Sequence, residues 1–230
     1  MTQISERSDE VYNEVRGIPG VMRVWHHARQ RMLADFMRLA APRPGEKILD
    51  IGVSDVITDE ANFLEQHFPR REDITCVGLG DGAAILAAYP GIAYRRIEAG
   101  APLPFADGQF AIATCNAVLE HVGDDADRRR MLAEMLRVAA RVFVTVPNRW
   151  FPVEHHTAIP LLHYCPPVFR AFCRAVGKGF WAEPRNLEFL DAARLVRLFP
   201  EESRPEAIRT GLLLGPFSSN LACVAGKRPA

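Results

Sequence analysis

Short apolar runs of strand length alternate with amphipathic segments through the middle of the chain. The apolar runs cover residues 48–51, 74–80, 92–97, 110–115 and 141–146. The segments between them have helical character at residues 60–65, 83–89 and around residues 131–136. Such runs are typical of buried strands, and their repeated alternation with helices predicts a parallel sheet covered by helices on both faces.

The flanking segments follow a different pattern. Residues 1–20 are polar, whereas residues 21–39 carry an apolar stripe at helical spacing that ends before Pro42 and Gly45. Residues 148–190 break the strand and helix rhythm with five prolines, many aromatic residues and three histidines. A segment this long is expected to have a function or helices of its own. Beyond it, Asp191 is expected to cap a last helix, and residues 208–214 and 221–225 to form a closing hairpin at the sheet edge.

These patterns predict one large α/β domain with an arm. We assign residues 1–44 to an N-terminal arm and amphipathic helix, and residues 45–230 to the main domain. Residues 148–190 are interpreted as an insertion on the side of the sheet where a substrate would arrive. The sequence has no internal repeat and no low-complexity tract.

Composition narrows the classes of function. The 230 residues are 48% hydrophobic, and 28 basic residues balance 28 acidic ones, which argues against nucleic acid or an anionic surface as partner. Five cysteines form no C-x-x-C pair, so we expect reduced thiols and a cytoplasmic protein. The polar N-terminus does not resemble a signal peptide, and no apolar run approaches the ~20 residues of a membrane span.

The first apolar run ends in an acidic residue and a glycine. Asp50 closes the run, and Gly52 follows two positions later. Glycine allows a sharp turn and lets a ligand approach the backbone closely. Ligands of open α/β sheets bind beyond the carboxyl ends of the strands, so the pattern favours a nucleoside-containing cofactor here. The alternative is a core strand followed by an ordinary loop.

A second stretch carries a family resemblance. Residues 103–110 read L-P-F-A-D-G-Q-F, and residues 118–121 read V-L-E-H. Together with the 48–52 run and the order of elements, they resemble the small-molecule branch of the class I S-adenosylmethionine-dependent methyltransferases, with a methyltransferase-11-like domain. The resemblance covers about residues 45–150. It implies a Rossmann-like, doubly wound sheet of about seven strands with the last strand antiparallel, and an inserted segment after the fifth strand.

The resemblance also implies where S-adenosylmethionine would bind. Asp81, or the backbone near Gly80, would meet the ribose, Glu98 would border the adenine, and Cys115 and Asn116 would border the amino-acid end. The full set of cofactor-binding candidates is Asp50, Gly52, Gly80, Asp81, Glu98, Cys115 and Asn116. The chain departs from the family pattern in three places: residues 53–55 replace further glycines, Gly80 stands where a carboxylate is usual, and Ala99 stands near where an aspartate is common.

The acceptor side is expected to combine a base with polar and aromatic contacts. An oxygen or nitrogen nucleophile must lose a proton, and histidine is the natural base, so His121 and His156 are the catalytic candidates. Both could equally be structural. The substrate-binding candidates follow the fifth strand, in a run that is similar to a subgroup of these enzymes: Asn148, Arg149, Trp150 and Glu154. The partner is expected to be a small-molecule methyl acceptor, such as a sugar or lipid-linked metabolite.

Three other interpretations fit parts of the sequence. The G-x-G-x-G pattern of residues 78–82 follows the second strand, whereas dinucleotide enzymes place their glycines after the first strand. A metal site built from Glu154, His155, His156 and His163 is disfavoured because adjacent histidines point apart, so no metal is expected. A non-catalytic binding or scaffold protein on the same fold is the main alternative, and it would not bind S-adenosylmethionine.

Overall fold

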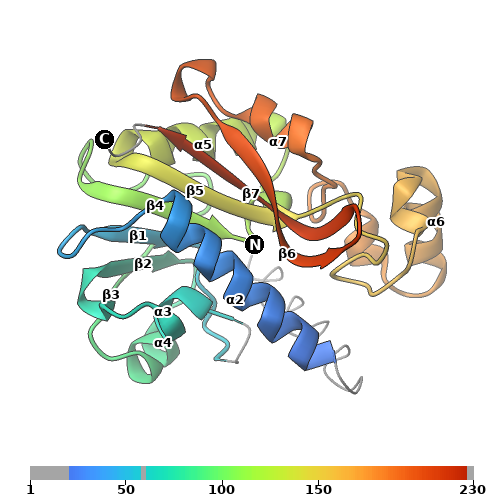
Figure 1. Ribbon diagram of the computed structural model, residues 1–230. Helices are drawn as coiled ribbons and strands as arrows, with labels where there is room; N and C mark the ends of the chain where they lie inside the picture. Colours follow the sequence, from blue (N-terminus) through green and yellow to red (C-terminus); the bar gives the residue numbers. More distant parts are fainter. Residues whose placement is uncertain (1–20, 58–60, 227–230) are drawn as a thin grey trace.

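The computed structural model describes residues 21–57 and 61–226 (Figure 1). The polar arm expected over residues 1–20 lies outside the described residues. The strands are β1 Ile48–Ile51, β2 Ile74–Gly78, β3 Ala93–Arg96, β4 Phe110–Asn116, β5 Ala139–Pro147, β6 Glu206–Leu214 and β7 Phe217–Gly226. The helices are α2 Val21–Leu39, α3 Phe63–His67, α4 Ala83–Ala88, α5 Asp125–Val138, α6 Pro166–Ala175 and α7 Ala192–Leu198. Five short 3₁₀ turns join them: η1 Arg71–Asp73, η2 Leu119–His121, η3 Leu162–Tyr164, η4 Gly179–Ala182 and η5 Glu201–Ser203.

The described strands form one seven-stranded sheet in the order β3-β2-β1-β4-β5-β7-β6. Strands β1 to β5 pair in parallel, β7 runs antiparallel to β5, and β6 runs antiparallel to β7. This topology confirms the Rossmann-like sheet expected from the sequence. Ile51 is in register with Val77 of β2 and with Cys115 of β4, so the carboxyl ends of these three strands meet at one edge.

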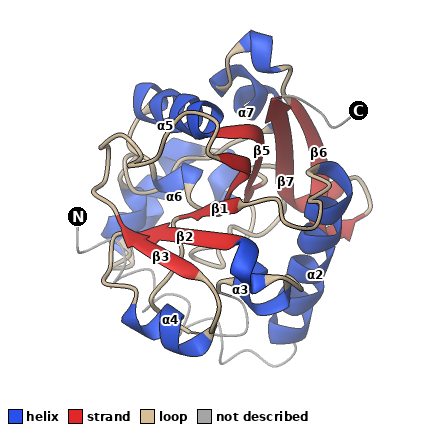
Figure 2. Ribbon diagram, turned by 90° about the vertical axis from the view of Figure 1, so that its left-hand side faces the viewer, coloured by secondary structure: helices blue, strands red, loops and turns tan. Residues whose placement is uncertain are grey.

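Helices cover the sheet on both faces, and each face has its own apolar core. Figure 2 shows α5 and α7 on one side and α3 and α4 on the other. The α5 and α7 core includes Leu132 of α5 and Leu195 of α7, packed against the inward residues of β1, β4 and β5. The opposite core includes Phe36 of α2, Leu64 of α3 and Ile85 of α4. The central strands are therefore buried on both faces, as their continuous apolar runs predict.

Helix α2 packs as its apolar stripe predicts. Met32 and Phe36 are buried, and the Phe36 ring meets the Phe143 ring of β5 edge to face at a centroid distance of 5.4 Å. Asp35 accepts a hydrogen bond of 2.7 Å from the Thr210 hydroxyl of β6. After the helix, Arg141 of β5 donates to the carbonyl oxygen of Ala40 at 2.8 Å. The first described helix is thus fastened to the β5–β7–β6 half of the sheet.

The helix expected over residues 60–65 begins later than the sequence suggested. It starts at Phe63, because Asn62 adopts a left-handed conformation with φ 54°. The Asn62 side chain accepts from the backbone N–H of Ser54 and donates to its carbonyl oxygen, at 2.9 and 2.7 Å. This two-way bond joins the two ends of the loop between β1 and α3.

Residues 148–190 form a small layer with its own core beside the carboxyl end of β5. Figure 1 shows α6 at the end of the molecule, beyond the turn of the β6–β7 hairpin. The apolar centre of this layer consists of Phe169, Cys173, Trp181, Ala182, Leu187 and Phe189. None of the helices in the described part of the chain is both long and apolar enough to cross a membrane.

Candidate active site

The chain turns at the end of β1 in the way that Gly52 predicts. Gly52 has φ +86°, and its N–H donates to the carbonyl oxygen of Val77 at 2.8 Å. A Cβ atom added at Gly52 would lie 2.5 Å from Cγ2 of Val118, a residue of the turn after β4. The glycine is therefore required both by its backbone conformation and by the close approach of the β4 turn.

Asp55 brings a carboxylate to the end of β2, where the family pattern has an acidic residue and this chain has Gly80. A Cβ atom added at Gly80 would lie 1.4 Å from Oδ2 of Asp55, so the two cannot occupy the same space. The carboxylate that a side chain at position 80 would supply is thus supplied by the loop after β1. In the sequence pattern, Asp55 stands out only as a residue in place of a glycine. The signal that could have revealed its role is a pair of features: an acidic residue in the loop after β1, and the absence of an acidic residue at position 80.

The other cofactor candidates differ in what they can offer. Asp81 is exposed, and its Oδ1 accepts a 2.9 Å hydrogen bond from the backbone N–H of Ala83 at the start of α4. Glu98 is exposed after β3, close to the strand edge. The Cys115 side chain is fully buried in the core, so only its backbone can face a ligand. Asn116 is partly exposed and accepts a hydrogen bond from Thr145.

Asp50 faces the interior rather than the ligand edge. It is 7% exposed and lies beside Glu65 of α3, which is fully buried. The Cys76 thiol donates to Glu65 at 3.1 Å. Burial, followed by the negative charge of Glu65, raises the pKa of Asp50 well above its ordinary value. The Asp50 side chain therefore lies in the interior beside α3, where it contributes to the structure of the end of β1.

The turn after β4 places two ionisable residues at the same edge of the sheet. Ala117 adopts a left-handed conformation with φ 54°, which costs a non-glycine residue about 1 kcal/mol. Its N–H is bonded to the carbonyl oxygen of Thr145 at 2.9 Å. The reversal leads directly into η2, which buries Glu120 and leaves the His121 side chain 16% exposed.

The structure brings both catalytic candidates together. Nε2 of His121 lies 3.0 Å from Nε2 of His156, and the rings are nearly perpendicular with centroids 4.7 Å apart. Trp181 packs against both rings. The two histidines are 35 residues apart in sequence, and no local pattern predicts their contact. His155 points away, as expected for a neighbour of His156, and its ring stacks on Phe151.

Glu154 orients His156 and does not face a substrate, which corrects the role expected from the sequence. Its oxygens accept hydrogen bonds from the backbone N–H and Nδ1 of His156 and from the N–H and hydroxyl of Thr157. The Nδ1 contact measures 2.9 Å, and Glu154 is 5% exposed. A carboxylate with this many donors is fully used within the protein.

The cluster has a defined charge distribution. Burial alone would raise the pKa of Glu154, but the positive charge of His156 and the hydrogen bonds from His156 and Thr157 hold it at about 2. Burial opposes the charged form of His156, yet Glu154 raises the pKa of His156 above its ordinary value. Burial and then the charge of His156 lower the pKa of His121 to about 3, so His121 is neutral at physiological pH. Burial raises the pKa of Glu120 to about 7.

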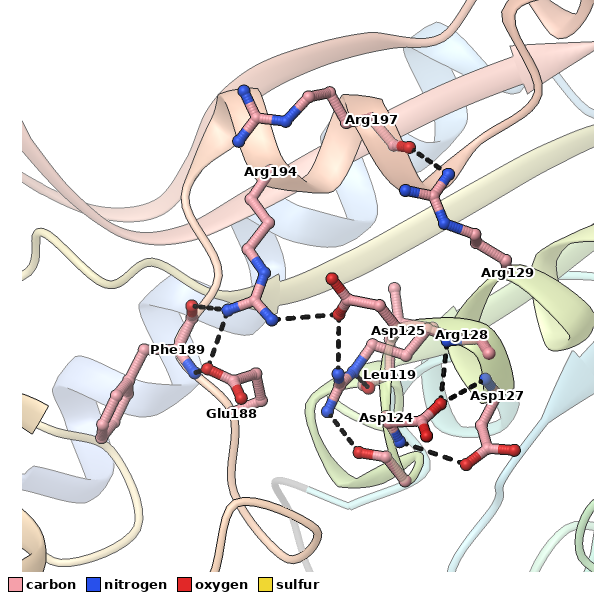
Figure 3. Close-up of polar contacts among 12 residues, drawn as sticks. Leu119, Asp124, Asp125, Asp127, Arg128, Arg129, Glu188, Phe189, Arg194 and Arg197 are labelled. Atoms are coloured by element: carbon pink, nitrogen blue, oxygen red, sulfur yellow. Dashed lines mark hydrogen bonds and ion pairs between the residues drawn. The ribbon is translucent and has the colours of Figure 1, made fainter.

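An arginine network fixes the η2 turn in place. Figure 3 shows Arg128 of α5 and Arg194 of α7 converging on Asp125, with N–O distances of 2.9 and 3.0 Å. Arg128 is 1% exposed and also donates to the carbonyl oxygens of Leu119 and Gly123. A run of three arginines, as at residues 128–130, is typical of a solvated helix face. That is wrong for Arg128, whose position on the helix turns it inward.

The same network reaches the inserted segment. Arg194 donates to the Glu188 carboxylate at 2.8 Å and to the carbonyl oxygen of Phe189 at 3.4 Å (Figure 3). The N–H of Glu188 in turn donates to the carbonyl oxygen of Glu120 at 3.0 Å. Helices α5 and α7 therefore hold η2 and residues 188–189 against each other.

The remaining substrate-binding candidates differ in whether their side chains are used within the protein or are accessible to a ligand. Asn148 is buried; it donates to Ser218 of β7 and accepts from the N–H of Trp150. Trp150 is 48% exposed, and the Arg149 guanidinium lies 5.0 Å from its ring centroid. Asn148, Arg149 and Glu154 line one small cleft, whereas Trp150 does not.

Comparison with known proteins matches this architecture to one class. Residues 60–141 match the family described as "Methyltransferase domain". A ubiquinone biosynthesis O-methyltransferase of Pseudomonas aeruginosa is 30% identical over 159 residues, covering 64% of this chain and 66% of the relative. One of Stutzerimonas stutzeri is 29% identical over 160 residues, with the same coverage. The chain thus spans slightly less than two thirds of the length of these relatives.

Solved structures agree in fold. A methyltransferase of Thermotoga maritima, described as dependent on S-adenosylmethionine and as a possible histamine N-methyltransferase, superposes with a TM-score of 0.60. It is 16% identical, and the match covers 99% of this chain and 100% of that one. A methyltransferase of Aquifex aeolicus has a TM-score of 0.52 at 11% identity, with coverage of 95% and 97%.

Residues 60–141 therefore carry a methyltransferase domain, on a fold shared with S-adenosylmethionine-dependent methyltransferases. The sequence matches and the fold thus support a class I S-adenosylmethionine-dependent methyltransferase, for which S-adenosylmethionine is the implied cofactor. The residues present fit that cofactor: Gly52 and Gly80 keep the strand ends free of their own Cβ atoms, and Asp55 presents a carboxylate beside Gly80. The family expected from the sequence is thereby confirmed.

Proposed function

We propose that the chain transfers the methyl group of S-adenosylmethionine to an oxygen atom of a small molecule. The proposal rests on one observation: the cofactor edge of β1 and β2 lies next to the cluster of Glu120, His121 and His156. The two are joined by the contact of Gly52 with Val118, a residue of the turn that leads to the cluster. The names of the matched O-methyltransferases support oxygen as the acceptor atom. The proposed acceptors include sugars and lipid-linked metabolites.

The proposed cofactor contacts revise one assignment made from the sequence. Gly52, Gly80 and Asn116 would border the cofactor, Glu98 its adenine, and Asp55 rather than Asp81 its ribose hydroxyls. Asp81 already accepts a hydrogen bond from the first turn of α4, whereas the carboxylate of Asp55 lies directly on Gly80. A carboxylate accepting from two hydroxyls forms charge-assisted bonds, which are the strong ones.

The acceptor would bind between η2 and residues 148–190. His121 supports this placement because it is the partly exposed member of its cluster. Trp150 offers exposed aromatic surface, and the partly buried Arg149 lies against its ring. Methyl transfer requires mainly alignment, because the sulfonium is already activated, and alignment is worth up to ~7–11 kcal/mol of the barrier. His121, the partly exposed member of the cluster, would lie against the acceptor and so help to orient it.

The experiment combines transfer with a matched pair of variants. The protein is incubated with methyl-labelled S-adenosylmethionine and a panel of phenols and hydroxylated sugars, and label in the small-molecule fraction is measured. We expect His121→Ala to lower turnover strongly with unchanged cofactor affinity, and His155→Ala to behave as wild type. Equal turnover in the two variants would contradict the placement of the acceptor beside His121.

The alternative function, a binding or scaffold protein on this fold, makes a different prediction. It requires no methyl transfer and no affinity for S-adenosylmethionine. Absence of both S-adenosylmethionine binding and methyl transfer would favour this alternative over the enzyme.

A further inference from the structure

The protonation of His121 and His156 is constrained by their partners. Nδ1 of His121 lies 2.6 Å from the carbonyl oxygen of Asn186, and Nδ1 of His156 lies 2.9 Å from Oε1 of Glu154. Carbonyl and carboxylate oxygens only accept hydrogen bonds, so both Nδ1 atoms carry a hydrogen. In the neutral rings each Nε2 atom then holds a lone pair, and these two atoms face each other at 3.0 Å.

Glu120 adds an anionic group to the same place. It is 1% exposed, and neither of its carboxylate oxygens has a hydrogen-bond partner among the described residues. Oε1 lies 3.8 Å from Nε2 of His121 and 4.0 Å from Nε2 of His156. A buried carboxylate without hydrogen-bond donors is costly, and His156 and Arg29 supply the positive charge that favours its ionised form.

Three electron-pair donors therefore converge on one point. Their separations of 3.0, 3.8 and 4.0 Å are close to the roughly 3.3 Å edge of a tetrahedron around an ion with bonds of about 2.0–2.1 Å. Two imidazoles and one carboxylate are a common ligand set for zinc sites that keep a fourth position open. These three residues have ligand atoms within 4.8 Å of one another.

The surroundings match those of metal-binding histidines. Such histidines usually donate their other ring N–H to a carboxylate or a backbone carbonyl, which fixes the ring and its tautomer. Glu154 does this for His156, and the carbonyl of Asn186 does it for His121. The partial exposure of His121 provides the side from which an ion can enter.

We propose that Glu120, His121 and His156 bind one divalent transition-metal ion of the Zn²⁺ type, with the fourth position open to water or to an oxygen of a bound molecule. The ion replaces the proton that must otherwise lie between the two Nε2 atoms. This differs from the expectation that the chain binds no metal, which rested on Glu154, His155, His156 and His163. Only His156 of that set belongs to the site, because β4 and its turn bring the other two ligands from a distant part of the sequence.

The test is metal binding by the chelator-treated full chain, measured without substrate and without activity. We expect calorimetry to give one equivalent of Zn²⁺, and Co²⁺ to give the visible absorption of a tetrahedral site. Glu120→Gln should weaken Zn²⁺ binding at least about tenfold. Its metal-free melting temperature should equal or exceed that of wild type, because an unpartnered buried charge is removed.

His155→Gln is the matched control and should bind Zn²⁺ as wild type does, since His155 lies outside the cluster. His121→Gln, at the partly exposed ligand, provides a second loss variant that does not disturb the buried carboxylate. Absence of stoichiometric Zn²⁺ binding by wild type would overturn the proposal. So would a loss of less than about tenfold in both Glu120→Gln and His121→Gln.

Discussion

The Nε2 atoms of His121 and His156 lie 3.0 Å apart although each ring already has an acceptor at its Nδ1 atom. One histidine follows β4, and the other lies in the segment that follows β5. Because β4 and β5 are parallel neighbours, their carboxyl ends deliver both residues to one edge of the sheet. The contact is therefore a consequence of topology, completed by the Glu154 and Asn186 hydrogen bonds.

The first prediction concerns Arg128, which holds the η2 turn. Arg128→Met should lower the free energy of unfolding by roughly 2–4 kcal/mol, because two carbonyl oxygens and Asp125 lose a buried donor. Arg128→Lys should recover only part of this, since an ammonium cannot reach all three acceptors from one position. Denaturant titration measures the loss. Arg129→Ala, at an exposed neighbour, should stay within about 0.5 kcal/mol of wild type.

The second prediction tests whether Asp55 has taken the role of an acid at position 80. Asp55→Ala should weaken binding of S-adenosylhomocysteine about ten- to a hundredfold, the equivalent of ~1.5–3 kcal/mol. Gly80→Asp alone should also bind poorly, because the new Cβ would collide with the Asp55 carboxylate.

The double variant Asp55→Ala/Gly80→Asp should bind more tightly than either single variant, because it restores the arrangement usual in the family. Asp81→Ala serves as comparison and should weaken binding less than Asp55→Ala. A larger effect of Asp81→Ala would instead support the assignment made from the sequence.

A structural feature could be predicted from the sequence where neighbouring residues alone determine it, and not where it depends on residues far apart in the chain. The strands ending at Ile51, Gly78 and Asn116 could be located because buried parallel strands are continuous apolar runs. The closing hairpin could be predicted from its two apolar runs of strand length. The helix after Asp191 could be predicted from its N-terminal cap and the helical spacing of its apolar residues. The start of α3 was misplaced, because the two-way bond between Asn62 and Ser54 has no local signature.

The sequence predicts which regions of the chain form the candidate site, but not which of their residues contact one another. The motif around His121 and the run around His156 were both identified, yet their meeting depends on the pairing of β4 with β5. The role of Glu154 was misjudged because a carboxylate near an aromatic run also suits substrate binding. Arg128 was placed on a solvated face, since three successive arginines do not reveal which one turns inward.

The third prediction concerns the buried pair of Asp50 and Glu65. The pKa of Asp50 is raised in the folded protein, so above about pH 4 the folded chain keeps a proton that the unfolded chain releases. This stabilisation is present at low pH and is lost as the pH rises towards the folded pKa, at up to about 1.4 kcal/mol per pH unit.

Asp50→Asn should therefore flatten the fall of the unfolding free energy with rising pH and make the protein more stable than wild type at neutral pH. Glu65→Gln should act in the same direction, because either variant removes one charge of the pair. Denaturant titrations across the acidic to neutral range measure both. A steeper pH dependence in Asp50→Asn would show that the pair is not strained at neutral pH.

The cofactor edge itself is tested most directly by calorimetric titration of the full chain with S-adenosylhomocysteine, with NAD⁺ titrated in parallel. We predict binding of one equivalent of S-adenosylhomocysteine, accompanied by a rise in melting temperature, and no binding of NAD⁺, because the glycines of residues 78–82 follow β2 rather than β1. Absence of heat and of a thermal shift at millimolar S-adenosylhomocysteine would contradict the assignment of this edge as a working cofactor site.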